Sequence, residues 1–571
     1  MIRDHSCRFF VFLNPDWDRD ASSRLRVRHC ILLFTFQCFI MTAQAVELPP
    51  LNEDNYNTSP LATAPTLQIE RFGFEGNTAF PDEELSELLA DYVGRPITSE
   101  ELQQARELLT QHYTSKGYIN SGAIIKRQTL EDGVLTFDIV EGKLTEIALK
   151  SSNKRRLRDG FIEGNVRQGL TTPLNMNQLR DRLQLLRQNT NIDRVNAELK
   201  PTGIPGESLL EINLEETSPY DVELIFDNSR APSIGAERLY LAVAHNNLTG
   251  NSDSLGVLYG LTRNGFEDMK FGDDKDIAGY YTLPVNHRGT TFELSASKND
   301  TLIVEEPFDQ FDITSESTTF GFSIRHPLYR KFDREISLSL TCERRNNETF
   351  FEGEPFSFSL GSQDGETTVS VVRFGIDGLK RSQHGVIAAY SAVSVGLDVL
   401  DSTQNPNPLP DGSFVSWQGQ LQYICRLFAT DIQLVSKVST QLSADPLLSL
   451  EQFSLGGSMS VRGYRENQII RDNGVAGSLE LRVPLITNKA GRFLMRLAPF
   501  VDYGYGWNKR DGQEGVPESE DICSVGLGLL FDPHPRVTGE LYWGYAFQDF
   551  EASDYDLQDD GIHFSFTVNV L

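Results

Sequence analysis

The sequence predicts an all-β transmembrane barrel of about 16 antiparallel strands, preceded by two small α+β units. The prediction rests on three observations. Residues 217–571 contain short runs that alternate apolar and polar side chains, whereas helical periodicity is confined to residues 67–216. The N-terminus resembles an export signal, and no later segment approaches the roughly 18 continuous apolar residues of a membrane-crossing helix. An exported chain that crosses a membrane without such helices does so as a closed barrel.

Residues 1–45 resemble a secretory signal. The basic run RLRVRH precedes the 12-residue apolar run CILLFTFQCFIM, and TAQA supplies small residues for cleavage after Ala45. The alternative is a membrane anchor, but such a short run cannot cross about 30 Å of hydrocarbon as a helix. Residues 46–66 are rich in proline, asparagine and threonine and are predicted to be a linker.

The composition argues against nucleic-acid binding and against common enzyme chemistry. The net charge is −28 and the sequence has no basic block, so no nucleic-acid partner is expected. The phosphate-loop, H-E-x-x-H, G-x-S-x-G and C-x-x-C motifs are missing from the sequence. We therefore predict no catalysis, no cofactor and no metal site. The cysteines that follow the signal are too far apart to indicate a disulfide framework: Cys342, Cys425 and Cys523.

Residues 67–142 are predicted to form the first α+β unit. An alternating strand is followed by two helices and then by a hairpin that turns near Asp132. Thr98 and Glu101 suit a capping box at the start of the second helix, which ends before Gly117. The first helix has apolar residues at helical spacing, and we expect all four to be buried: Leu85, Leu88, Leu89 and Tyr92.

Residues 143–216 repeat the same order of elements. KLTEIALKS is predicted to be a strand, LRDGFIEGNVRQGL and NMNQLRDRLQLLRQN helices, and RVNAELKP with SLLEINLEE a closing hairpin. The second helix places Leu179, Leu183 and Leu186 on one face. The leucine stripes are interpreted as core packing against two three-stranded sheets.

Residues 217–571 show the pattern of barrel strands. In the final run, GIHFSFTVNVL, apolar residues from Ile562 to Val570 alternate with polar ones such as His563, which is the apolar-out, polar-in pattern of a membrane barrel. A soluble sandwich would also alternate, but with more charge on its polar face. The polar stretch at residues 299–318 is predicted to be an extracellular loop, and the acidic run FGDDKD, which starts at residue 271, a solvated loop.

One segment of this region does not have the pattern of a strand. LGGSMSVRGYREN, residues 455–467, places a lone arginine, Arg462, before a Gly-Tyr bend. Further along, alternation within APFVDYGYGW puts Phe500, Asp502 and Gly504 on one face of a strand. If the loop folds into the barrel, the guanidinium loses water and needs a partner. The Asp502 carboxylate can accept two parallel hydrogen bonds from it. The alternative is an arginine exposed on a surface loop.

These segments together resemble the two-partner secretion outer-membrane transporters of the haemolysin secretion/activation type, within the BAM-like superfamily. FSLGGSMSVRGYREN resembles the signature loop of that family, APFVDYGYGW its paired strand motif, and LIFDNSRAPSIGAERLYLAVAHNNLTGNSDSLGV its first barrel hairpin. The resemblance covers residues 67–571. It identifies residues 67–142 and 143–216 as tandem POTRA (polypeptide-transport-associated) domains in the periplasm and residues 217–571 as the barrel.

The resemblance implies that Arg462 pairs with Asp502 and holds the signature loop inside the barrel. The residues implied in this loop lock are Val461, Arg462, Gly463, Tyr464 and Asp502. The motif residues that would support it are Gly456, Gly457, Phe500 and Gly504.

The implied function is translocation of a secreted partner polypeptide, unfolded in transit, across the bacterial outer membrane. The POTRA domains would bind it by adding a strand to a sheet edge. The other implied partners are outer-membrane lipid and the barrel-assembly machinery. Two alternatives stay open. One is an insertase of the BAM-like class, although such proteins usually carry more than two POTRA domains. The other is a diffusion porin or adhesin, in which POTRA domains have no obvious use.

Overall fold

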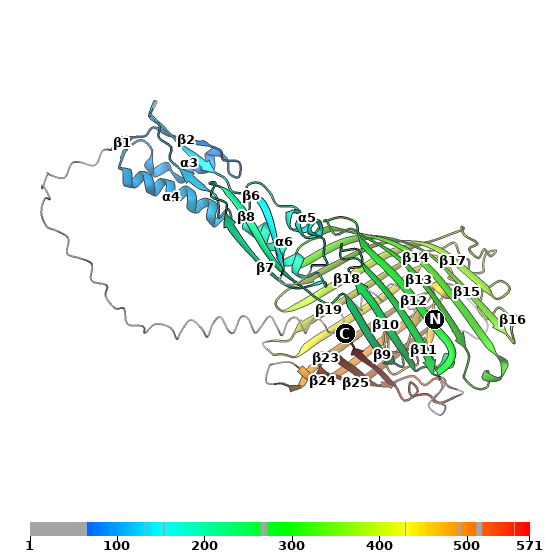
Figure 1. Ribbon diagram of the computed structural model, residues 1–571. Coiled ribbons are helices and arrows are strands. Elements are labelled where there is room, and N and C mark those ends of the chain that lie inside the picture. The colour runs from blue at the N-terminus through cyan, green and yellow to red at the C-terminus, as the bar shows by residue number, and fades with distance from the viewer. Residues whose placement is uncertain are drawn as a thin grey trace. The chain divides into compact units, whose positions relative to one another are not determined.

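The computed structural model describes residues 66–130, 132–151, 155–263, 271–428, 430–488, 493–509, 517–552 and 554–571. The predicted signal at residues 1–45 and nearly all of the predicted linker lie outside these ranges. The described chain forms two compact units. One is the barrel unit, which contains residues 217–571 and Arg156–Arg158; the other is the α+β unit, which contains the remaining described residues (Figure 1).

The first half of the α+β unit contains one mixed three-stranded sheet and two helices. Its elements are β1 (Leu67–Gln68), β2 (Arg71–Glu75), α3 (Asp82–Leu88), the 3-10 helix η2 (Ala90–Tyr92), β3 (Pro96–Ile97), α4 (Ser99–Ser115), β4 (Gly122–Ile124) and β5 (Val134–Val140). The sheet order is β2-β5-β4, and β2 runs parallel to β5. The short strands β1 and β3, which the sequence did not indicate separately, pair with each other.

The capping box predicted for the second helix is confirmed. The Thr98 hydroxyl accepts a hydrogen bond from the Glu101 backbone N–H at 3.2 Å, and the Glu101 carboxylate accepts one from the Thr98 N–H at 2.8 Å. The expected burial of Leu88 is wrong, since its side chain is 36% exposed. The helix ends at Leu88, and the non-helical Leu89 (φ −103°, ψ 9°) turns its own side chain into the core instead.

The second half of the α+β unit repeats this arrangement, as the sequence predicts. Its elements are β6 (Lys143–Ser151), α5 (Asp159–Arg167), α6 (Met176–Arg187), β7 (Ile192–Pro201) and β8 (Glu207–Glu216), with sheet order β6-β8-β7. The two halves touch where α4 ends and α6 begins. The Met176 N–H donates to the Gly117 carbonyl at 2.9 Å, and the Asn175 side chain donates to the Lys116 carbonyl at 3.0 Å.

The barrel unit is a closed antiparallel sheet, which confirms the predicted fold class (Figure 1). Its sixteen wall strands are β9 (Tyr220–Asp227), β10 (Arg238–Asn246), β11 (Ser254–Arg263), β12 (Phe271–Pro284), β13 (Thr291–Leu302), β14 (Ile313–Arg330), β15 (Arg334–Phe351), β17 (Glu366–Arg381), β18 (Gly385–Leu397), β19 (Val415–Arg426), β20 (Gln433–Ser443), β23 (Asn473–Thr487), β24 (Phe493–Trp507), β25 (Ser519–His534), β26 (Val537–Ala546) and β27 (Ile562–Asn569). The two-residue strand β16 (Glu354–Pro355) pairs antiparallel with the last two residues of β15. Strand β27 pairs with β9 and closes the sheet.

Alternation sets the two faces of the wall. On β24, Val501 and Tyr503 are 41% and 46% exposed on the outer face, while Asp502 between them is fully buried on the inner face. A polar residue that faces inward can bond to other protein groups, whereas an outer position favours an apolar side chain in contact with lipid. In the part of the chain that the structure describes, no helix has both the length and the apolar character needed to span a membrane.

One loop prediction is half right and a second is wrong. Residues 303–312 connect strands β13 and β14, but the other half of residues 299–318 belongs to these strands. The acidic run that starts at residue 271 opens strand β12 and is not a loop. The strand ladder is built from backbone hydrogen bonds, which do not require apolar side chains. Polarity therefore misplaced the ends of these strands.

Candidate functional site

The segment between β20 and β23 leaves the wall and folds into the barrel. We call residues 444–472 the inward loop. It contains the 3-10 helix η5 (Ser449–Glu451) and a hairpin of β21 (Phe453–Leu455) and β22 (Ile469–Arg471), with residues 456–468 as its tip. The tip and its hairpin pack against the inner faces of β23 and β25, in an apolar cluster formed by Leu455, Val461, Tyr464, Ile469, Ala476 and Ile522.

Arg462 and Asp502 meet at the centre of this contact. Arg462 Nε donates to Asp502 Oδ2 at 2.8 Å and Nη2 donates to Oδ1 at 2.9 Å, which is a bidentate pair. The Arg462 backbone N–H also donates to Oδ2, at 3.1 Å. Arg462 is 6% exposed and Asp502 0%, so the structure does not show an exposed loop arginine.

Aromatic rings cover the guanidinium on the inner wall. Its central carbon lies 3.7 Å from the ring centroid of Phe500 and 4.7 Å from that of Tyr542, within the range of cation–π attraction. Burial by itself would lower the pKa of Arg462. Its hydrogen bonds with Asp502 and the charges of Asp502 and Glu480 outweigh burial and raise that pKa above its ordinary value, so the arginine stays charged.

Two further side chains on β23 complete the binding site of the arginine. Arg462 Nη2 donates to Ser478 Oγ at 2.9 Å, and Nη1 donates to Glu480 Oε2. Glu480 also accepts from Arg482 Nε at 2.7 Å. Ser478 is the cross-strand neighbour of Asp502, which explains why one guanidinium reaches both strands.

The backbone of the tip lies against the backbone of the wall at Gly463. This residue has φ +94°, which disfavours side chains. A Cβ added to Gly544 on β26 would lie 2.7 Å from the Gly463 Cα, so the close approach needs glycine on both sides. The Gly463 N–H donates to His563 Nε2 at 3.3 Å. A Cβ on Gly504 would lie 2.9 Å from Val461, and Gly456 and Gly457 form the turn at the start of the tip.

Tyr464 bonds to the backbone of β25 and to the backbone of the segment that follows β26. Its hydroxyl donates to the Cys523 carbonyl at 2.8 Å and accepts from the backbone N–H groups of Phe547 and Gln548 at 3.2 and 3.1 Å. The last two residues begin the segment between β26 and β27, which we call the 547–561 loop. The structure thus brings all nine of the sequence-derived site residues into one region, on the tip and the inner face of β24.

Comparisons with known proteins assign the chain to a family. The family model of the haemolysin secretion/activation protein ShlB/FhaC/HecB matches residues 206–531, more than half of the chain, and the ShlB-type POTRA domain model matches residues 67–142. The chain belongs to the haemolysin secretion/activation family. It is therefore an outer-membrane barrel transporter of two-partner secretion, which moves a secreted partner protein across the outer membrane. This confirms the resemblance inferred from the sequence.

Individual members of the family are distant in sequence. The chain is 24% identical over 440 residues to the outer membrane transporter CdiB of Dickeya dadantii (strain 3937), covering 76% of this chain and 74% of that protein. It is 23% identical over 468 residues to the heme/hemopexin transporter protein HuxB of Haemophilus influenzae (strain 86-028NP), covering 79% and 78%. The solved structure of CdiB from Escherichia coli matches with a TM-score of 0.68 at 21% identity, over 90% of this chain and 93% of that one; this likeness is one of fold.

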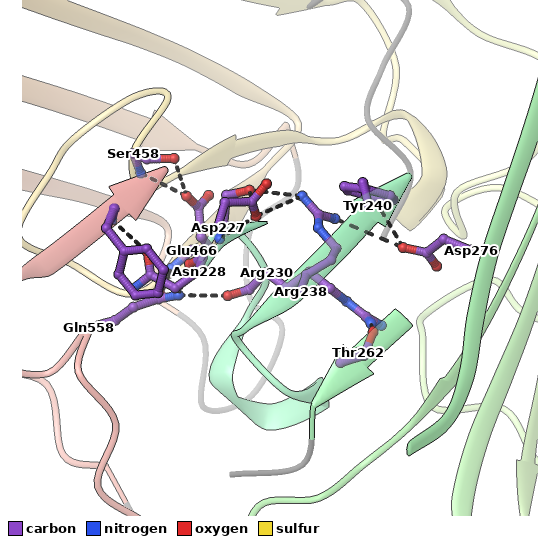
Figure 2. A network of polar contacts seen from close by, with 12 residues as sticks. Asp227, Asn228, Arg230, Arg238, Tyr240, Thr262, Asp276, Ser458, Glu466 and Gln558 are labelled. Carbon is purple, nitrogen blue, oxygen red and sulfur yellow. Dashed lines mark hydrogen bonds and ion pairs between the residues drawn. The ribbon is translucent and has the colours of Figure 1, made fainter. Parts of the chain in front are cut away.

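A second polar network joins the tip of this transporter, through the 547–561 loop, to the backbone that follows strand β9 (Figure 2). Gln558, which is fully buried in the 547–561 loop, donates to the backbone oxygens of Asn228 and Arg230 at 2.6 and 2.7 Å. It accepts from the Glu466 N–H at 2.8 Å, and Glu466 accepts in turn from the Ser458 N–H at 2.7 Å. Figure 2 also shows Arg238 beside Asp227, at 3.2 Å. The tip is thus bonded to the start of the wall as well as to β24.

Arg465, also in the tip, forms ion pairs with acidic residues of two loops between strands. Its guanidinium donates to both Asp559 carboxylate oxygens at 2.6 and 2.7 Å and to Glu305 at 2.5 Å. The hydrogen bond with Asp559 and the contact with Glu305 outweigh burial and raise the pKa of Arg465. The tip therefore holds two loops between strands, the 547–561 loop and the connection between β13 and β14.

Sequence reasoning missed several of these residues. The run GSLELRVP on β23 alternates Ser478, Glu480 and Arg482 on one face, and this polar alternation directly before the Asp502 strand was a usable signal. Gly544 lies inside the strand run YWGYAF, where a glycine indicates a close approach of another backbone. Gln558 lies in a polar loop, and no sequence pattern singled it out.

Replacement of Tyr464 by phenylalanine is expected to loosen the 547–561 loop. The substitution leaves the Gln548 N–H without its acceptor, at a cost of about 1–3 kcal/mol, whereas the Phe547 N–H keeps its bond to the Cys523 carbonyl at 3.0 Å. Hydrogen exchange at Gln548 should become faster, and the channel should open more often in planar lipid bilayers. Tyr555→Phe, at an exposed position of the same loop, is the control. Unchanged exchange in Tyr464→Phe would show that the hydroxyl does not hold the loop.

Proposed function

We propose that the inward loop closes the channel and that the contact between Arg462 and Asp502 keeps it closed until a partner arrives. The observation that carries this proposal is the buried Arg462, bonded to Asp502, Ser478 and Glu480 on the wall. Loss of one partner of a buried ion pair is costly, because the other charge is left buried without compensation. The pair can therefore hold the loop against the wall. When the tip is displaced, the pair is broken and the loop is released.

The loop leaves a cavity beside it. This cavity of about 1090 Å³ is lined by the loop and by inner-face residues of the wall. Uncharged polar side chains are frequent among them, including Thr301, Ser315, Ser317, Asn347, Gln418, Gln420, Ser439 and Gln441. Such a lining offers hydrogen bonds to a polypeptide backbone without selecting one charge. We infer that the partner passes here, unfolded, once the loop has moved.

The α+β unit is proposed to receive the partner in the periplasm. We assign residues 67–142 and 143–216 to two POTRA domains, residues 217–571 to the barrel, residues 1–45 to a signal peptide and residues 46–66 to a linker. The partner would add a strand to an open sheet edge, because backbone bonds make few demands on its sequence. Strand β7, at the end of the β6-β8-β7 sheet, offers ten residues for this contact.

Adjacent proline substitutions on β7 are expected to separate partner binding from folding. The N–H groups of consecutive strand residues point to opposite edges of the strand. Of the two variants Asn196→Pro and Ala197→Pro, one therefore removes an N–H on the open edge. The other removes an N–H that bonds to β8. The outward variant should keep the fold by circular dichroism and lose binding of a denatured partner segment in a titration of residues 67–216. Wild-type binding should be micromolar-class and tolerate added salt. Steep loss with modest salt would mean that charge carries the contact.

The remaining interactions follow from the same assignment. Lipid would contact the apolar outer face of the wall, and the barrel-assembly machinery would insert the chain. We propose that the chain acts as a channel and not as an enzyme, because transport in this scheme needs no covalent step.

The test of the function is secretion of the protein encoded beside this transporter. Co-expression should place that protein in the medium, and deletion of the transporter should retain it inside the cell. A general loss of outer-membrane barrels on deletion, with secretion unaffected, would support an insertase instead. Passage of small solutes without any dependence on the neighbouring protein would support a porin.

A further inference from the structure

We call residues 444–452 and Asp472, where the inward loop leaves and rejoins the wall, its stem. The stem makes a second contact with the wall. Glu451, at the end of η5, is 5% exposed. Its carboxylate accepts hydrogen bonds from Arg373 Nη2 at 2.8 and 2.9 Å and lies 3.4 Å from Arg345 Nη1. Arg345 also donates to the Leu450 carbonyl at 3.2 Å. Arg345 and Arg373 belong to β15 and β17, which are different strands from those that hold the tip.

One of the buried charges of this wall site comes from the stem. On the wall, Glu343 lies 3.1 Å from Arg345 and 3.2 Å from Arg373. Glu451 adds a second carboxylate, and all four side chains are buried. Removing the loop stem would take the Glu451 carboxylate away from two buried guanidinium groups, which is unfavourable.

Apolar contacts at the stem support the same conclusion. Val369 and Val371 lie on the inner face of β17, where the barrel pattern favours polar residues, and are only 0% and 2% exposed. They belong to one cluster with Leu447 and Leu448 of the loop stem and with Phe414. The stem thus covers part of the surface of the two valines, and its departure would expose that part.

A buried carboxylate joins the two ends of the loop. Asp472 accepts from the Leu447 N–H at 3.0 Å and from Gln452 Nε2 at 3.0 Å. It also accepts from the Lys509 N–H at 2.9 Å, beyond the end of β24. These bonds therefore hold the two ends of the inward loop together without any residue of the tip.

We propose that Glu451 is a positioning residue, which keeps the stem of the inward loop bound to β15 and β17 as a fixed pivot while the tip leaves Asp502. The tip and stem contacts share no side chain, so either can break while the other persists. A fixed stem would let the tip swing aside and return to the same position after each passage. The inference rests on the proposed role of the loop as the moving element.

Distances between spin labels on the full-length protein test this pivot. One label is placed at Met459 in the tip or at Ser449 in the stem, and the other at Val393 on the outer face of β18. In Arg462→Ala the distribution of distances from the tip label should broaden from a single peak. The distribution of distances from the stem label should keep its single peak. In Glu451→Gln the stem distance should broaden while the tip peak persists. The labels require a background in which the native cysteines are serine: Cys342, Cys425 and Cys523.

The controls separate a pivot from a general loss of structure. Glu354→Gln, at an exposed position, should change neither distance. Leu448→Ala weakens the apolar part of the stem contact without a buried charge and should broaden the stem distance if Glu451→Gln does not assemble. Equal broadening at both positions in Arg462→Ala, or an unchanged stem in both stem variants, would overturn the proposal. Channel conductance tests the tip contact independently, so a failure of the proposed function would be recognised separately.

Discussion

Replacing Arg462 by alanine is expected to open the channel while the barrel still assembles. The change leaves Asp502 buried and without its partner, at a cost of about 3–5 kcal/mol in a dry site. Water in the lumen should reduce this, and if about half remains, the closed-to-open equilibrium shifts by roughly 10- to 100-fold. Conductance of the purified protein in planar lipid bilayers measures the shift, and heat-modifiable migration on a gel reports assembly. The expected cellular result is impaired secretion at nearly normal outer-membrane abundance.

Asp502→Ala should have a smaller effect than Arg462→Ala. In that variant Arg462 keeps Glu480 and Ser478, whereas among the described residues Arg462 is the only cation paired with Asp502. The double variant should be no worse than Arg462→Ala, because the two residues act together. The charge exchange is not expected to restore closure, since an aspartate at position 462 would face Glu480. Arg334→Ala, at the exposed start of β15, is the control, and additive defects in the cycle would contradict the pairing.

Gly544→Val is expected to open the channel without altering any charge. Its Cβ would lie 2.7 Å from the Cα and 2.8 Å from the N of Gly463, and 2.9 Å from the carbonyl carbon of Arg462. These are backbone atoms of the tip and cannot turn aside as a side chain can. Overpacking of this kind costs about 1–3 kcal/mol, which the tip can avoid by leaving the wall.

The matched control for this substitution is Gly477→Val on β23. A Cβ at position 477 meets no atom within 4 Å, so the added side chain should leave conductance unchanged. Gly544→Val should resemble Arg462→Ala in conductance, and combining the two should add little because both release the same tip. A folded Gly544→Val barrel with wild-type conductance would show that the tip contact does not close the channel.

Strand alternation and helix signals determined much of this molecule from sequence. Alternation places Asp502 and Phe500 on the inner face of β24 because side chains in a strand point to opposite faces at each step. The helix that begins after Thr98 also follows from local sequence, since its capping box uses residues three positions apart. Local patterns succeed where the deciding contacts are close in sequence. They failed at Leu88, because the helix ends there and the non-helical Leu89 is buried while Leu88 is exposed.

Only the tertiary structure decided what each inner-face group touches. Barrel closure brings Gly544 of β26 against Gly463, and the course of the inward loop brings Glu451 to Arg373 and Arg345 of β17 and β15. These partners are far apart in the chain, and their spacing carries no periodic signal. Alternation states that a side chain faces inward but not which other inward side chain it meets. That choice depends on the closure of the whole sheet and on the path of the loop within it.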